Sequence, residues 1–196
     1  MRRRTSSCLA LGVLFLFGHT AVSAAQQNIT ILVHDYAGID NPTLQATEQE
    51  AAQVFRHADI EIGWKLCHSE VKSPEMECPD IGPTNPALRL VSRFQFVAGV
   101  RADTMGYSTG YMMTVSVEEA DTVARSIASP VGQVLGLIIA HELRHLLLGR
   151  NHSSGGIMRA RWGLSDWMLA RQGELVFLPR QAAALRAELR ARNELP

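Results

Sequence analysis

SPVGQVLGLIIAHELRHLLLGRNH, residues 129–152, predicts the helix around which the rest of the chain folds. Ser129 suits the N-cap of a helix and Pro130 its first position, while Gly149 suits the residue that ends it. Nearly every side chain between these ends is apolar, which predicts a helix that is buried on almost all sides. The charged residues near its middle argue against a membrane span.

Two histidines and a glutamate interrupt this apolar helix. His141 and His145 stand four residues apart, with Glu142 beside the first. Residues at this spacing lie on one face of a helix, so their imidazoles can bind one cation. Zinc accepts imidazole nitrogen, and a catalytic zinc site keeps one position for water, from which Glu142 is placed to take a proton. Because buried polar groups are costly without compensation, a metal ion also explains why they occur here.

A third histidine and a methionine follow the helix. His152 lies just past Gly149, where a turn can bring it back toward the metal, and Met158 comes six residues later in a glycine-rich turn. A methionine in that turn can fill a gap beneath the site without binding the metal. The alternative is a chance HExxH run whose histidines are hydrogen-bonded in a core. The context of the run favours metal binding.

This pattern resembles the metzincin family of zinc metallopeptidases, whose usual motif is HExxHxxGxxH followed by a Met-turn beneath the metal. Here Gly149 falls four residues after His145 and His152 seven, which is one residue more than the usual offsets. The resemblance implies three zinc ligands, one general base and one supporting methionine: His141, His145, His152, Glu142 and Met158.

The extra residue leaves two possibilities for the third ligand. A helix that runs one residue longer, through Leu148, leaves the same exit geometry for His152. Otherwise a downstream carboxylate, Asp166 or Glu174, supplies the third ligand, as in the gluzincins. We favour His152, with ordinary surface or helix-capping roles for the two acids.

Residues 1–24 have the pattern of a secretory signal peptide. Three arginines at 2–4 precede an apolar run at 9–17, and the small residues at 21–25 fit cleavage after Ala24. The alternative is an uncut membrane anchor, but the run is short for the roughly 20 residues that a span requires. We therefore expect a secreted or periplasmic protein with no stable membrane insertion after cleavage, and one zinc metallopeptidase-like domain over 25–196.

The charge and the cysteine content of the chain indicate which partners it can bind and in which cellular compartment it folds. Nineteen basic and nineteen acidic residues balance over the full chain, and the leader removes three arginines, which leaves a mildly acidic protein. No basic stripe is present, so we expect no nucleic-acid partner. Cys67 and Cys78 remain after cleavage, and in an oxidising compartment they predict a disulfide.

The rest of the chain predicts an α+β fold, a small mixed sheet packed on helices. We expect strands over 28–33, 60–66, 88–96 and 111–117, and helices over 43–58, 118–126, 162–171 and 180–193, the third starting near 165. The first strand, helix and strand favour a parallel pair, Asn41-Pro42 marks a turn, and Ala183 faces inward in the last helix.

Residues 103–110 are expected to form a loop. In metzincins a sheet-edge strand holds the substrate, and residues 106–111 resemble that edge by position alone, a plain hairpin being the alternative.

Together these features predict an exported zinc-dependent endopeptidase that hydrolyses bonds in peptides or proteins, with a zinc-bound water activated by Glu142. The alternative is a non-enzymatic exported domain, either zinc-binding or an interaction module on a peptidase-like scaffold. Glu142 argues against it, since a structural zinc site needs no adjacent carboxylate and is more often closed by a fourth protein ligand. Nothing in the sequence identifies a specificity pocket.

Overall fold

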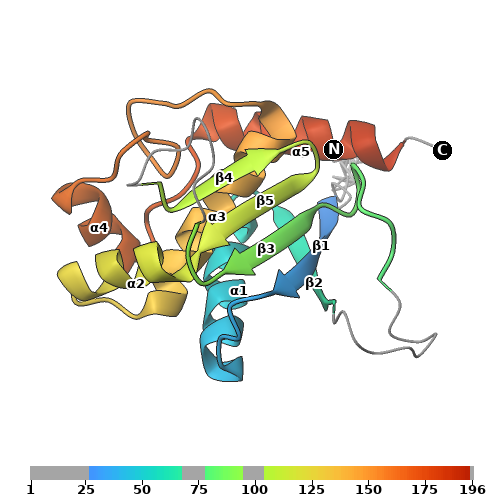
Figure 1. Ribbon diagram of the computed structural model, residues 1–196. Coiled ribbons are helices and arrows are strands. Elements are labelled where there is room, and N and C mark those ends of the chain that lie inside the picture. Colours follow the sequence, from blue (N-terminus) through green and yellow to red (C-terminus); the bar gives the residue numbers. More distant parts are fainter. Residues whose placement is uncertain (1–26, 68–77, 95–103, 195–196) are drawn as a thin grey trace, which may run out of the picture.

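The computed structural model describes residues 27–67, 78–94 and 104–194 (Figure 1). Their strands form one sheet in the order β2-β1-β3-β5-β4. The first four of these run parallel to one another, and β4 is antiparallel to β5 at the sheet edge. This mixed sheet with its helices confirms the predicted α+β class. The strands are β1 (Gln27–Asp35), β2 (Ile60–Leu66), β3 (Ala87–Val91), β4 (Gly106–Thr109) and β5 (Met112–Ser116).

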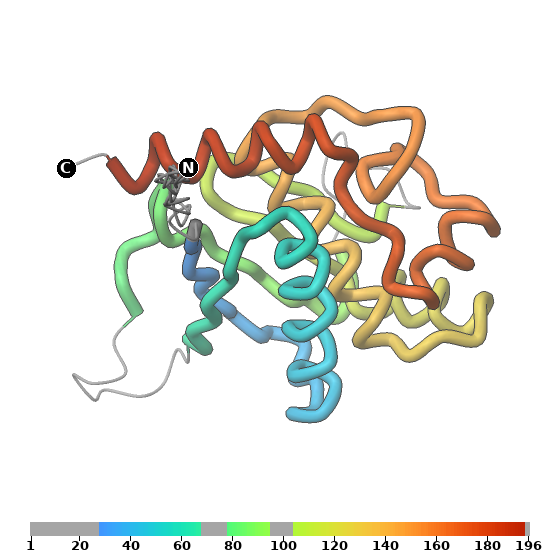
Figure 2. Tube along the Cα trace, turned by 180° about the vertical axis from the view of Figure 1, so that it is seen from behind, coloured from blue at the N-terminus to red at the C-terminus, as the bar shows by residue number. Residues whose placement is uncertain are grey.

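Five helices accompany the sheet in the described part of the chain. They are α1 (Asn41–Arg56), α2 (Val117–Ser126), α3 (Val131–Leu148), α4 (Leu164–Arg171) and α5 (Pro179–Asn193). Helices α1 and α3 lie behind the sheet in Figure 1 and in front of it in Figure 2, where α5 crosses one end. The main core fills the space between the sheet and these helices.

Helix α1 connects β1 to β2, which pair in parallel as predicted. The Asp40 carboxylate caps it by accepting a hydrogen bond of 2.7 Å from the Thr43 amide. The prediction of a turn at Asn41-Pro42 is wrong, because both residues belong to the first helical turn. Proline fits there since the first amides of a helix have no intrahelical partner in any case.

Helix α3 is the buried helix that the sequence predicts. It begins at Val131, one residue later than expected, and the Ser129 hydroxyl bonds the Gln133 side chain instead of capping the backbone. A Cβ at Gly132 would lie 2.8 Å from the Ala46 Cβ, and one at Gly136 would lie 2.7 Å from the Thr47 carbonyl oxygen. Glycine therefore lets α3 and α1 approach closely. Although α3 is long and apolar enough to cross a membrane, 72% of it is buried in the fold, as in a core helix.

The remaining elements differ from prediction in detail. Residues 106–109 form strand β4 instead of a loop, and β3 ends at Val91, with residues 95–96 of the expected strand outside the described part. In α5 it is Ala182 that is buried, while Ala183 is exposed. Helix α4 starts at Leu164, within one residue of its expected beginning.

A disulfide joins Cys67 to Cys78, as predicted, with a Cα–Cα distance of 5.8 Å. Cys67 packs with Leu32 and Ala87 in a small second core on the sheet. The predicted leader, residues 1–24, lies outside the described residues.

Candidate metal centre

Three histidine side chains meet at the C-terminal end of α3, and we refer to His141, His145 and His152 as the histidine cluster. His141 and His145 are each 9% exposed, whereas His152 is exposed and lies after the helix. The Nε2 atom of His145 lies 2.9 Å from that of His141 and 3.1 Å from that of His152. Nitrogens about 2.0–2.1 Å from one tetrahedral ion lie about 3.3 Å apart, so the spacing suits a metal ion. The cluster is a possible three-histidine metal site.

Backbone carbonyls orient the two buried rings. The Nδ1 atom of His141 donates to the Ile157 oxygen at 2.8 Å, and that of His145 donates to the Gly149 oxygen at 3.1 Å. Since a carbonyl only accepts, each Nδ1 carries the hydrogen and each neutral ring presents a lone pair at Nε2. Two lone pairs 2.9 Å apart repel unless a cation lies between them. The chemistry of the donors therefore fits a metal ion.

A proton is a poor substitute for that metal ion. Burial lowers the pKa of His141 to about 4, and the positive charge that would form on the neighbouring rings acts in the same direction. Burial also lowers the pKa of His145 from its ordinary value. Both rings are therefore neutral near pH 7, which is the form that binds metals.

The exit loop, residues 149–152, returns His152 to the cluster. Gly149 ends α3 with φ of +84°, a conformation that favours glycine. The Arg144 guanidinium, 9% exposed, donates to the carbonyl oxygens of Gly149 at 2.9 Å and Asn151 at 2.7 Å. Helix α3 runs through Leu148, so the extra residue of the motif is absorbed by the helix. The role of Arg144 was missed, although an arginine in an apolar helix was a signal for it.

Neither acid considered as a third ligand joins the histidine cluster. Asp166 is buried in the first turn of α4, where its Oδ2 accepts from the Gly163 amide at 2.8 Å and its Oδ1 lies 3.5 Å from Arg159 Nε. Glu174 is exposed. The structure gives Asp166 the helix-capping role that we favoured.

The Met158 turn, residues 153–159, lies against the cluster. Met158 is fully buried, and its carbonyl oxygen accepts from the Ser153 amide at 2.9 Å. The Ile157 carbonyl that orients His141 also accepts from Trp162 Nε1 at 2.9 Å, and the Trp162 ring packs edge-on to His141 at 5.7 Å. The sequence does not indicate either contact with His141. The Ile157 contact is made by a main-chain carbonyl, and the Trp162 contact by a side chain that lies beyond the motif.

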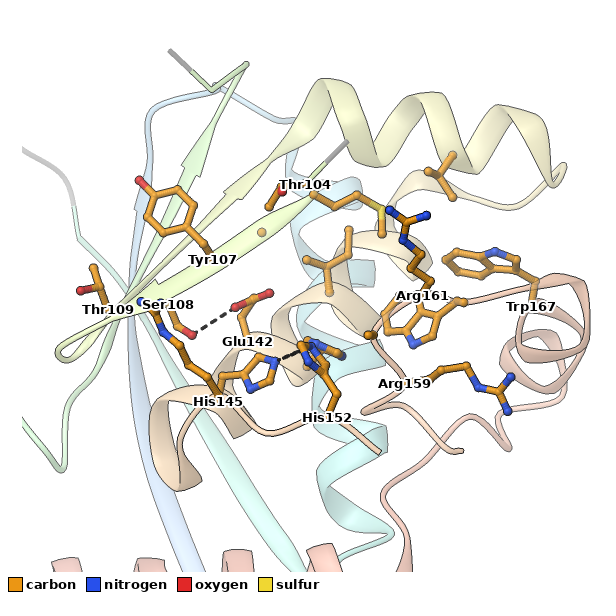
Figure 3. A pocket seen from close by; sticks show the side chains of 18 of the residues that line it. Thr104, Tyr107, Ser108, Thr109, Glu142, His145, His152, Arg159, Arg161 and Trp167 are labelled. Carbon is orange, nitrogen blue, oxygen red and sulfur yellow. Dashed lines mark hydrogen bonds between the residues drawn. The ribbon is translucent and has the colours of Figure 1, made fainter. Parts of the chain in front are cut away.

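Glu142 lies between the cluster and strand β4 (Figure 3). Its side chain is 7% exposed, and the Ser108 hydroxyl donates to its Oε2 at 3.1 Å. Burial raises the pKa of Glu142 to about 7, although the Ser108 hydrogen bond and the Arg150 charge both act to lower it. A Cβ at Gly106 would lie 2.9 Å from Glu142 Cγ, so glycine at this position lets β4 lie against α3.

A cleft of about 1100 Å³ opens over these residues. Residues 104–109 form one wall, and Arg150, His152, residues 159–162 and Trp167 of α4 also line the cleft. Figure 3 shows His152, Arg159 and Trp167 away from the wall that carries Ser108 and Thr109. The Ser116 amide of β5 donates to the Met105 carbonyl oxygen, so the main-chain groups of Met105 point toward β5. The Ser108 carbonyl oxygen instead accepts a hydrogen bond from Arg150 Nη2 at 3.4 Å. Because main-chain groups alternate along a strand, those of Gly106 and Ser108 point away from β5. Strand β4 is therefore a sheet edge beside the cleft and also one arm of a hairpin with β5.

No protein-family model matches the chain, and no match was found among curated proteins. The possible metal site therefore rests on the geometry described above.

Proposed function

We propose that this protein is an exported, zinc-dependent endopeptidase of the metzincin type. The observation that carries the proposal is the convergence of three imidazole Nε2 atoms beside a buried carboxylate in an open cleft. No fourth histidine, cysteine or acid joins the cluster among the residues that the structure describes. Three protein ligands and an open position are typical of catalytic zinc, whereas structural zinc is usually closed by four.

His141, His145 and His152 would hold the zinc ion. Imidazole nitrogen also suits copper, nickel and iron, but three histidines with an open position beside a glutamate favour zinc. When bound, zinc supplies Lewis-acid chemistry, lowering the pKa of water and polarising a carbonyl group. The carbonyls of Ile157 and Gly149 fix the two buried rings, which reduces the reorganisation needed for binding.

Glu142 is the proposed general base. Burial raises the pKa of this carboxyl to about 7 in the metal-free protein, and a bound zinc ion beside it would lower that pKa, which favours the carboxylate that a general base requires. Ser108 Oγ holds Oε2, which leaves Oε1 to take a proton from the attacking water and to pass it to the leaving amine. A non-enzymatic zinc domain would have no need of a buried carboxylate in this position.

The edge strand β4 supports a peptide as substrate. Its outward main-chain groups, at Gly106 and Ser108, lie along the cleft that contains the histidine cluster. An extended peptide can add to such an edge by main-chain hydrogen bonds, which bind peptides independently of their sequence.

Export is the remaining part of the proposal. The leader predicted at residues 1–24 and the Cys67–Cys78 disulfide both favour an oxidising compartment outside the cytosol. The resemblance of the HExxH helix, Gly149, His152 and Met158 to the metzincin motif supports the family assignment.

The test compares the mature protein with Glu142→Gln by elemental analysis and by cleavage of a peptide library. We expect one zinc in both proteins and hydrolysis lower by roughly 10²–10⁴-fold in the variant, the usual contribution of a general base. Full hydrolysis by Glu142→Gln would refute the assigned base. A zinc-loaded wild type that cleaves no peptide would favour the non-enzymatic alternative.

A further inference from the structure

We propose that the cleft selects acidic peptide segments and that Arg150 determines this specificity by binding a substrate carboxylate. The inference rests on the proposed peptidase function, because it names the substrate class of the same cleft. It is carried by the charges that line the cleft and by the contacts of one arginine.

The cleft and the rest of the chain differ in the sign of their charge. Residues 25–196 carry nineteen acidic and sixteen basic side chains, since three of the nineteen Lys and Arg residues lie at 2–4. The described lining of the cleft reverses this balance, with three arginines at 150, 159 and 161 and a single carboxylate, Glu142. A cleft lined by one sign of charge attracts ligands of the opposite sign.

Two of the three arginines are less suited to a direct contact beside the reacting groups. The Arg159 Nε atom lies 3.5 Å from Asp166, and in Figure 3 its side chain extends away from His152. Arg161 lies toward Trp167, at the opposite end of the cleft from Ser108 and Thr109 (Figure 3). Arg161 adds positive charge to that end, but it is farther from Glu142 and Ser108.

Arg150 lies next to the proposed catalytic groups. It is exposed in the exit loop, and its Nη2 donates to the Ser108 carbonyl oxygen at 3.4 Å. The Ser108 hydroxyl is in turn bonded to Glu142 at 3.1 Å. No carboxylate of the described residues forms an ion pair with Arg150 at hydrogen-bond distance. The only hydrogen-bond acceptor that the described residues offer it is the neutral Ser108 carbonyl at 3.4 Å, so its other N–H groups are available to a ligand even though its charge also acts on Glu142.

The position of Arg150 matches the expected path of the substrate. A peptide paired with the outward groups of Gly106 and Ser108 would meet this guanidinium at the Ser108 carbonyl and replace its long contact of 3.4 Å there. Arginine presents a planar set of donors that binds a carboxylate through two parallel hydrogen bonds, which makes the contact selective as well as strong. An aspartate or glutamate beside Ser108 would satisfy it, whereas a lysine would be repelled.

The first experiment measures cleavage specificity. Wild-type protein loaded with zinc is given a peptide library, and matched peptides that differ only in Asp or Asn at the selected position are then compared. We expect acidic residues to be enriched, and Arg150→Gln to lower the ratio of kcat/KM for the Asp peptide to kcat/KM for the Asn peptide by roughly 10–100-fold. Arg150→Glu should transfer the preference to Lys. Arg190→Gln, an exposed substitution on α5 outside the cleft, is the matched control.

The second experiment measures binding without hydrolysis. The same Asp and Asn peptides are titrated into zinc-loaded Glu142→Gln protein by calorimetry, with and without Arg150→Gln. We expect tighter binding of the Asp peptide, and a preference that weakens as salt rises from about 0.05 to about 0.5 M because the charges are screened.

The two experiments separate the inference from the function on which it rests. Hydrolysis of Asp and Asn peptides at equal rates would overturn the acidic specificity and leave the peptidase standing. Preferential binding of the Asp peptide with no hydrolysis by wild type would support the selectivity and overturn the peptidase. Loss of zinc from Arg150→Gln, measured by elemental analysis, would make Arg150 a support of the exit loop and overturn its role in specificity.

Discussion

The buried and the exposed parts of the histidine cluster are held in different ways. His141 and His145 belong to α3, which is covered by the core and fitted closely against α1 through Gly132 and Gly136. His152 is exposed, and its loop is held by the two hydrogen bonds that Arg144 donates. Packing therefore fixes two proposed ligands before any metal binds, whereas the third depends on a few polar contacts. We therefore expect mutations in the packing of α3 to lower the stability of the protein, and mutations in the exit loop to lower its metal affinity.

The largest effect is expected where α3 meets α1. At Gly136 an added Cβ would lie 2.7 Å from the Thr47 oxygen and 2.5 Å from the Glu50 Cβ, and backbone atoms cannot move aside cheaply. Gly136→Val should therefore lower the free energy of unfolding by about 3 kcal/mol, although valine forms helices better than glycine. Urea denaturation measures this. Gly155→Ala, where a Cβ would meet nothing within 4 Å, is the control, and equal stability of both variants would refute the packing argument.

The second prediction concerns the buried carboxylate in metal-free protein. Because the folded pKa of Glu142 is raised to about 7, its contribution to stability is present below the unfolded value near 4.5 and is lost as pH rises through 7. Glu142→Gln should therefore stabilise the metal-free protein at pH 8, by up to about 3 kcal/mol, and have no such effect below pH 4.5. Denaturation curves across this range, in the presence of a chelator, measure the difference. Glu174→Gln, at an exposed glutamate, should show none.

The third prediction isolates the exposed part of the cluster. Arg144→Met removes both hydrogen bonds that Nη1 donates to the exit loop while keeping a long apolar side chain in α3. Zinc affinity should fall about 10–100-fold, the usual effect of removing a group that orients a ligand, with the helix retained in circular dichroism. Competition with a chelator measures the affinity. His152→Ala should lower it at least as far, and unchanged affinity in both variants would show that the third ligand lies elsewhere.

The same contrast explains what the sequence could predict. The local sequence is enough to predict helix α3 and the shared face of its two histidines, because a long apolar run with polar residues four apart is typical of a buried helix. Ser108 lies 34 residues before Glu142, and only the tertiary fold brings the two together. Strand β4 is short, begins at a glycine and gains its structure from pairing with β5, so its local sequence resembled a loop. In α5 the run of alanines at 182–184 offers no periodic marker, which explains the choice of Ala183 over Ala182.

The smallest effect is expected at the contact between β4 and the proposed base. Ser108→Ala removes the hydroxyl that donates to Glu142 Oε2 at 3.1 Å but leaves the histidines and their carbonyl partners in place. Hydrolysis should fall about tenfold with zinc content unchanged, since a hydrogen bond to a charged group is lost.

That hydrogen bond lowers the pKa of Glu142, so the acid limb of the plot of kcat against pH should also move to higher pH in Ser108→Ala. Ser108→Thr, which keeps the hydroxyl, should restore the profile, and Ser126→Ala, elsewhere on the cleft lining, should leave it unchanged. A profile that does not move in Ser108→Ala would mean that Ser108 supports the packing of β4 on α3 and does not position the base.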